Sequence, residues 1–194
     1  ELKNGQSLLA RPLTVGVLEA STRSEQASFD DDYARRLIEL VAGYVPPADF
    51  WDPSKPIPKT EFHLMAMDGK YDEDGRFVEK TIFYIPNEFL VKLVPLLNQM
   101  LTRAAPDCPN RFVAVGSINP RRADWREQIC LLKRSKVSWI KWRPSSMDFD
   151  PKAQSSSFYK ELANAGIGIL SHTGVSEAVK LSPEKDKYSS PKQL

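Results

Sequence analysis

The sequence lacks several features on which whole classes of protein depend. Its 194 residues include only two cysteines, Cys108 and Cys130, too few for a disulfide scaffold and too far apart for a CxxC zinc or redox site. We therefore expect two free thiols in a reducing compartment. No apolar run approaches the roughly 20 residues that cross a bilayer, and the first residues show no signal-peptide pattern. These absences predict a cytoplasmic protein with no membrane partner.

An excess of charge of one sign is missing as well. The formal net charge is +2 and the basic residues are scattered, so the chain lacks the basic footprint of a nucleic-acid-binding protein. Apolar residues make up 41% and charged residues 27%, which is the range of globular proteins and excludes wholesale disorder. We expect a globular protein whose partner is a small-molecule substrate, with homo-oligomerisation left open.

The motifs of common enzyme classes are also missing. The chain has two histidines, and it contains no HxH, HExxH or GxSxG sequence and no phosphate-binding loop. A hydrolytic metal site normally uses three or more ligands. One histidine and one lysine do not complete such a site, so any metal site predicted from these residues is partial.

Four short apolar runs that alternate with amphipathic segments organise the centre of the chain. The runs predict strands that end near Met67, Ile118, Lys141 and Ser171. Because a helical pattern fills each gap, we predict an α/β fold with a parallel sheet and right-handed crossovers. We expect a single domain over residues 1–194. Residues 1–60 would form an irregular and helical lead-in, with weak helices before residue 27 and one helix from about 28 to Gly43. Residues 61–180 would form the βα units, with helices at 88–103, 123–134 and 157–164. A polar tail would follow at 181–194.

The strongest candidates for catalytic residues stand where the last two strands end. Lys141 lies in the run Ile-Lys-Trp-Arg-Pro, and His172 precedes Thr-Gly. Catalytic groups gather at the carboxyl ends of parallel strands because the loops there are free to hold substrate. His172 could bind a metal or act as a general base, or it could simply bond a loop carbonyl. Lys141 is costly to desolvate unless it is paired, modified or able to reach water.

Three more polar residues fall on the same predicted rim and are candidate substrate-binding residues. Asp68 and Asn119 follow the first two predicted strands, and Arg143 follows the third. Turn formation explains Asp68 and Asn119 equally well, since each begins a turn pair. Arg143, together with Arg121, could recognise an anionic substrate.

Several of these segments, taken together, resemble the amidohydrolase superfamily. The similarity covers roughly residues 60–180 and is greatest to the branch of metal-dependent hydrolases related to the amidohydrolase-2 decarboxylases and hydrolases. The motifs that carry it are Phe112-Val-Ala-Val-Gly-Ser-Ile-Asn-Pro120, Val137-Ser-Trp-Ile-Lys-Trp-Arg-Pro144, Phe149-Asp-Pro151 with Phe158-Tyr159, and Ile169-Leu-Ser-His-Thr-Gly174.

The resemblance implies a distorted (β/α)8 barrel, the TIM barrel, of which the predicted strands would be the second to the fifth. It implies a divalent metal (zinc first, manganese or iron as alternatives) with His172 as a ligand. Lys141 would occupy the fourth-strand lysine position, which is carboxylated in some branches. The implied reaction is hydrolysis of a C–N or C–O bond by metal-activated water. Non-oxidative decarboxylation and a non-catalytic small-molecule-binding module are the alternatives.

The chain also departs from the family pattern. The family's HxH pair, its sixth-strand histidine and its eighth-strand aspartate do not occur in the sequence. We therefore expect an incomplete central portion of a barrel that is inactive by itself.

Overall fold

A computed structural model describes residues 29–52, 54–79, 84–174 and 187–193. The chain divides into two compact units. Unit 1 comprises Glu1–Leu64 with Lys92–Val113, and unit 2 comprises Met65–Val91 with Ala114–Leu194. The helices predicted before residue 27 lie outside the described residues, and the single domain stays a prediction.

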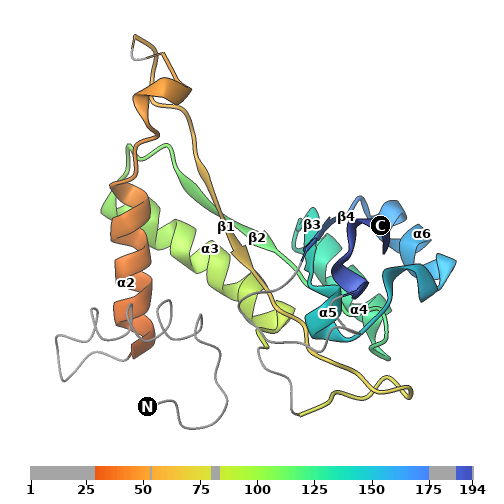
Figure 1. The fold of residues 1–194 in the computed structure, drawn as a ribbon. Helices are drawn as coiled ribbons and strands as arrows, with labels where there is room; N and C mark the ends of the chain where they lie inside the picture. Colours follow the sequence, from red (N-terminus) through yellow and green to blue (C-terminus); the bar gives the residue numbers. More distant parts are fainter. Residues whose placement is uncertain (1–28, 53, 80–83, 175–186, 194) are drawn as a thin grey trace, which may run out of the picture. The chain divides into compact units, whose positions relative to one another are not determined.

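The elements confirm the predicted mixed α/β class with short parallel strands, in two small sheets that do not close within the described ranges (Figure 1). None of the helices in these ranges is long and apolar enough to cross a membrane. The elements are α2 (Phe29–Ala42), η2 (Ala48–Phe50), β1 (Glu61–Met65), α3 (Asn87–Ala104), β2 (Arg111–Val115), α4 (Trp125–Arg134), β3 (Trp139–Trp142), α5 (Pro144–Met147), η3 (Pro151–Ala153), α6 (Ser156–Ala165), β4 (Gly168–Ser171), η4 (Lys187–Ser189) and η5 (Pro191–Gln193).

Two asparagines tie the parts of unit 1 together. The side-chain amide of Asn110 donates to the carbonyl oxygens of Val41 and Tyr44, both 2.9 Å away, and thereby satisfies acceptors at and after the end of α2. Asn98 on α3 bonds both the amide and the carbonyl group of Phe112 on β2, at 2.8 and 2.9 Å. These bonds place α2 and α3 against the strand pair without any charged group.

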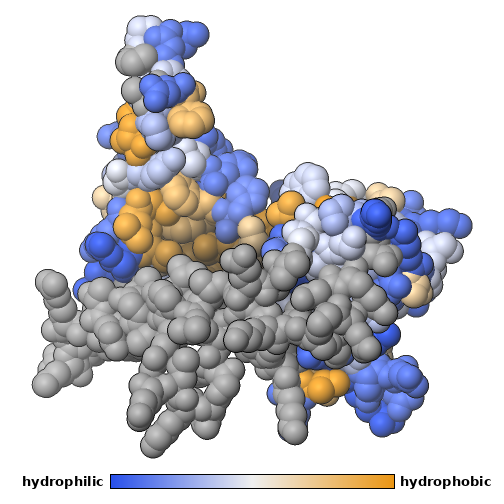
Figure 2. All heavy atoms as spheres, in the orientation of Figure 1, coloured by the Kyte–Doolittle hydropathy of each residue, from blue (hydrophilic) through white to orange (hydrophobic). Residues whose placement is uncertain are grey.

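Large apolar side chains are also exposed on unit 1. Leu40 on α2 is 53% exposed, and Leu96 and Met100 on α3 are 56% and 40% exposed. Figure 2 shows apolar side chains, in orange, on the visible face of the part that contains these helices. Exposed apolar patches often mark interaction surfaces. A homo-oligomer nevertheless stays a prediction.

Within unit 2, hydrogen bonds link the residues at the carboxyl ends of the strands to one another. The amide of Ala66, just after β1, donates to the carbonyl of Val115 at 2.8 Å. Gly116, just after β2, exchanges two hydrogen bonds with β3, through the carbonyl of Trp139 and the amide of Lys141. β3 pairs with β4 in parallel. Consecutive strands separated by helices are therefore neighbours, as the alternating pattern predicts.

The core of unit 2 lies between β3–β4 and the helices α4 and α6. Ile140 and Trp142 of β3 are at most 1% exposed, and they share one apolar cluster with Leu132 of α4 and with Phe158 and Leu162 of α6. Side chains alternate between the two faces of a strand. Trp139, Lys141 and Arg143 therefore lie on the other face of the sheet, which α4 and α6 do not cover.

A close approach between β2 and α4 requires glycine at position 116. A Cβ atom built on Gly116 would lie 2.4 Å from a methyl group of Leu132, which is fully buried. Because the leucine has no free space to move into, we expect Gly116→Ala to destabilise the protein by about 1–3 kcal/mol. Urea denaturation measures this effect.

Gly168→Ala is the matched control for Gly116→Ala. The added methyl at position 168 would meet the ring of Trp139 at 2.5 Å. That ring is 48% exposed and can turn away into solvent. Equal destabilisation by the two substitutions would contradict the role assigned to Leu132.

The sequence pattern did not predict α5, a helix of four residues that follows Arg143. Pro144 occupies its first turn, where the missing amide proton costs nothing, and Asp148 ends it in a left-handed conformation with φ of 60°. A helix this short has no hydrophobic period to detect. By contrast, the predicted end of α6 at Gly166 is confirmed, with φ of 70°.

Candidate functional site

Three basic side chains meet at the carboxyl ends of β3 and β4. Lys141 stands opposite Leu170 in the strand register, and the amide of His172 donates to the carbonyl of Trp142 at 2.8 Å. Alternation along the strands then places Lys141, Arg143 and His172 on the same face, the one that α4 and α6 leave uncovered. We call these three residues the cationic rim.

Burial and mutual repulsion both disfavour the charged forms of the cationic rim. Burial lowers the pKa of Lys141, and the positive charge of Arg143 lowers it further. The pKa of His172 is lowered by burial first and then by the charges of Lys141 and Arg143. Burial also lowers the pKa of Arg143. Arg143 therefore lies close enough to Lys141 and His172, and Lys141 close enough to His172, for its charge to disfavour theirs.

The carboxylate partners that usually neutralise such cations are missing from this site. Among the ion pairs of the described residues, none involves Lys141 or Arg143. Arg122 in the same unit is different, because it pairs with both Asp68 and Asp124. An unneutralised, half-buried cation is costly.

The Nε2 atom of His172 is buried and has no hydrogen-bond partner among the described residues. Buried polar atoms are nearly always bonded, and an exception calls for an explanation such as an absent ion or ligand. Because the pKa of His172 is lowered, the neutral imidazole prevails at neutral pH and Nε2 can be an electron-pair donor.

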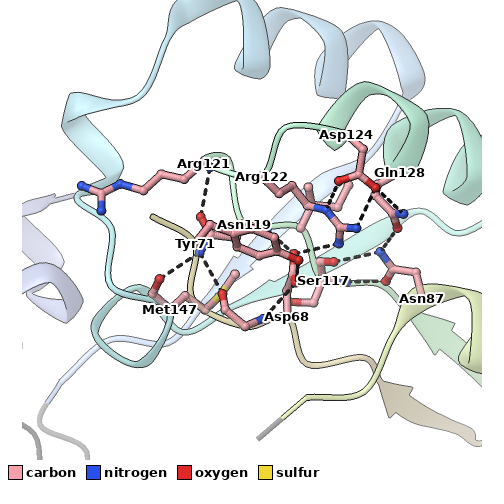
Figure 3. Close-up of polar contacts among 12 residues, drawn as sticks. Asp68, Tyr71, Asn87, Ser117, Asn119, Arg121, Arg122, Asp124, Gln128 and Met147 are labelled. Carbon is pink, nitrogen blue, oxygen red and sulfur yellow. Dashed lines mark hydrogen bonds and ion pairs between the residues drawn. The ribbon is translucent and has the colours of Figure 1, made fainter. Parts of the chain in front are cut away.

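The other two candidates, Asp68 and Asn119, meet in a buried hydrogen-bond network rather than on the cationic rim (Figure 3). The carboxylate of Asp68 accepts from the amides of Gly69 and Asn119, from the Tyr71 hydroxyl and from the Arg122 guanidinium, at 2.6 to 3.1 Å. Asp68 is 7% exposed and Asn119 is fully buried. Four donors occupy the carboxylate, so its contacts in the described residues are structural. A role in binding substrate stays a prediction for both residues.

The Asn119 side chain holds two loops at once. Its amide group donates to the carbonyls of Gly69 and Met147 at 2.9 and 2.8 Å, while its oxygen accepts from the amide of Arg121. The turn that Asn119 forms with Arg121 agrees with the turn-forming alternative. In Figure 3 the Arg121 side chain points away from this network, so only its backbone belongs to it.

Arg122 is the cation at the centre of the network, and the sequence pattern did not single it out. It donates to Asp124 through Nε and Nη2 at 2.7 and 2.9 Å, and to Asp68 through Nη1 at 3.1 Å. Burial alone would lower the pKa of Arg122, but the hydrogen bonds to Asp124 and the charge of Asp68 raise it overall. The guanidinium also lies over the ring of Tyr71, 5.4 Å from its centroid. The pKa of Tyr71 is raised by burial and by the charge of Asp68.

A chain of neutral hydrogen bonds extends the network to the strand that carries Lys141. Gln128 on α4 accepts from the amide of Asn87 at 2.8 Å, and Asn87 bonds both the amide and the carbonyl of Ser117 at 2.9 Å. The Ser117 hydroxyl then donates to the carbonyl oxygen of Lys141 at 2.8 Å. Buried side chains therefore fix the backbone of the cationic rim.

The sequence pattern missed Asn87, Gln128 and Arg122, and only part of a signal existed for them. Asn87 follows Pro86 at the start of a predicted helix, which indicates a cap but no partner 30 residues away. No periodicity relates Asp68 to Arg122, which are 54 residues apart. Contacts of this kind depend on the strand order.

The donor set suits part of a metal site. In the described ranges, no group of three or more His, Cys, Asp and Glu side chains could hold a metal ion. The buried Nε2 of His172 fits one ligand position, and Lys141 lies on the same face of the sheet. Any further ligands would have to come from outside the described residues. Comparison of the chain with protein-family models, curated proteins and solved structures finds no match.

Proposed function

We propose that this chain is a portion of a metal-dependent hydrolase of the amidohydrolase type, with β1 to β4 as consecutive strands of a (β/α)8 barrel. Two observations in unit 2 support this proposal: β3 and β4 pair in parallel, and Gly116, just after β2, forms a parallel bridge with Ile140 of β3. In such a barrel the helices cover the outside and the site lies at the carboxyl ends of the strands. The uncovered face with the cationic rim corresponds to the inside.

The observation that carries the proposal is the buried Nε2 atom of His172, which has no partner within the part of the chain that the structure describes. A neutral imidazole is the commonest protein ligand of zinc. Lys141 is the second residue that would hold the metal, as a carboxylated bridging ligand or as a contact to the substrate. Burial and the charge of Arg143 lower the pKa of Lys141, which makes the neutral amine, the form that carboxylation requires, easier to reach.

When bound, a divalent metal lowers the pKa of its water ligand and polarises the carbonyl group of a C–N or C–O substrate. The residues of this chain contribute position and charge. Ser117 holds the backbone of Lys141 through a bond of 2.8 Å, which restricts where the amine can reach. Arg143 lies within electrostatic range of both Lys141 and His172, so an anionic group on the substrate would be attracted to this rim.

The two histidines provide a matched test of metal binding. We expect the full-length protein that contains this chain, prepared with zinc or manganese and then desalted, to retain metal, measured by inductively coupled plasma mass spectrometry. His172→Ala is expected to weaken retention by at least about 100-fold, because even outer-shell substitutions cost about 10- to 100-fold. His63→Ala is the control, since that side chain is 38% exposed on β1 beside Glu61. The proposal fails if neither protein retains metal, or if both variants lose it equally.

A small-molecule-binding module without turnover is the second candidate, and the short ligand set favours it. The histidine test separates the two, because a module of this kind needs no metal. Non-oxidative decarboxylation on the same scaffold would share the metal-binding result. For location we keep the cytoplasm as a proposal, on the two free thiols alone.

A further inference from the structure

The uncovered face of β3 and β4 has a polar end and an apolar end. The cationic rim occupies the carboxyl end. On the same face, Leu170 is level with Lys141 and Trp139 lies toward the amino end, and the two residues are 44% and 48% exposed. Leu170 stands beside Lys141 in the register, and the ring of Trp139 lies over Gly168. Basic and apolar groups therefore lie in one row along the strand direction.

We propose that this face binds a small organic carboxylate, with Arg143 and Lys141 holding the anionic group and with Leu170 and Trp139 supporting the apolar body. This inference rests on the proposed function only in placing a small-molecule site at this rim. It needs neither a metal nor turnover.

Charge complementarity supports an anion as the occupant. Arg143 is half-buried and forms no ion pair among the described residues, whereas the more buried Arg122 has two carboxylate partners. The backbone of Arg143, and not its side chain, makes the bonds with Met147 that begin α5. These bonds fix the backbone of Arg143, and its guanidinium forms no ion pair with any of the described residues. Arginine donors match a carboxylate in geometry and charge.

The apolar end favours an organic anion over an inorganic one. Residues on one face of a strand are spaced by about 6.6 Å along it. A ligand whose carboxylate meets Arg143 would therefore reach Leu170 with the first few carbon atoms of its body and Trp139 with the next. Burying that body removes apolar surface from water, which stabilises the complex in proportion to area.

The test uses 4-phenylbutyrate as the probe and its uncharged analogue 4-phenylbutanol, titrated by calorimetry into protein treated with a chelator. We expect saturable binding of the carboxylate, and binding of the alcohol weaker by about 10- to 100-fold, because charge-assisted hydrogen bonds are lost. Arg143→Gln should reduce affinity for 4-phenylbutyrate by a similar factor. Arg143→Lys, which keeps the charge, should retain part of it.

Two controls make the result specific. Arg134→Gln removes an exposed arginine in the last turn of α4 and should leave the affinity unchanged. Leu170→Ser should weaken the binding of 4-phenylbutyrate but not that of acetate, which has no apolar body to contact Leu170. Circular dichroism checks that each variant is folded. Equal binding of acid and alcohol, or an equal loss in Arg143→Gln and Arg134→Gln, would overturn the inference. Because the titration uses protein freed of metal, its result does not depend on whether His172→Ala loses metal binding.

Discussion

Replacing Arg122 by methionine is expected to lower the free energy of unfolding by about 3–5 kcal/mol. The substitution leaves the carboxylate of Asp68 buried without its cation, and breaking a buried ion pair from one side costs about this much. The two side chains are 8% and 2% exposed and lie 3.1 Å apart. Three donors to Asp68 remain, from Gly69, Tyr71 and Asn119, which places the loss toward the lower end. Urea denaturation measures the change.

An exposed ion pair supplies the control for this prediction. Arg76 lies 3.4 Å from Asp74, but the two side chains are 78% and 70% exposed, so Arg76→Met should change stability by less than about 1 kcal/mol. The double variant Arg122→Met with Asp68→Asn removes the stranded charge. It should be more stable than the sum of the single losses predicts, by about 1 kcal/mol or more. Additive losses would show that the two residues do not act as a pair.

Truncating Trp142 is expected to have an effect of the same size for a different reason. Its side chain is 1% exposed and packs against Phe149 and Phe158, with ring centroids 4.9 and 5.8 Å away. Its indole also donates to the carbonyl of Ile118 at 2.7 Å. Trp142→Ala should therefore cost about 3–5 kcal/mol through the cavity that it leaves. Thermal unfolding should show a melting temperature lower by roughly 6–20 °C.

Trp139, three positions earlier on β3, is the natural control for Trp142. It lies on the uncovered face and is 48% exposed, so Trp139→Ala should cost about 1 kcal/mol or less. Similar losses for the two tryptophans would mean that something buries both faces of β3 in solution. That outcome would contradict the assignment of one covered and one uncovered face.

The sequence by itself determined the element types and their order. Strands near 62–67 and 112–118, and the helices at 88–103, 123–134 and 157–164, all occur, with ends that differ by a few residues. Their signals are local: an apolar run for a buried strand, a 3.6-residue period for a helix, and Gly166 in a left-handed conformation for a helix end. Each such signal is contained within one segment and survives without tertiary information.

The position of the cationic rim was also predictable from the sequence. Lys141 and His172 each end an apolar run, and β3 pairs with β4 in parallel, so their ends meet at one edge. The same rule expected Asp68 and Asn119 to lie with them at one rim. In the structure these two residues bond each other in a buried network, and their role in binding substrate stays a prediction. Sequence position places a residue at a strand end, but it does not say which way the side chain turns.

Only the tertiary structure decided which polar groups are satisfied and which are not. Asp68 meets Arg122 across 54 residues, and Asn87 meets Ser117 across 30, through contacts that depend on strand order and loop packing. Those partners turn one set of strand-end residues into a structural network. Within the described residues, by contrast, no ion pair involves Arg143 and no hydrogen-bond partner reaches the Nε2 atom of His172. Hydrogen bonds and ion pairs act over a few ångströms, so their pairing depends on distances in space, which spacing along the chain does not specify.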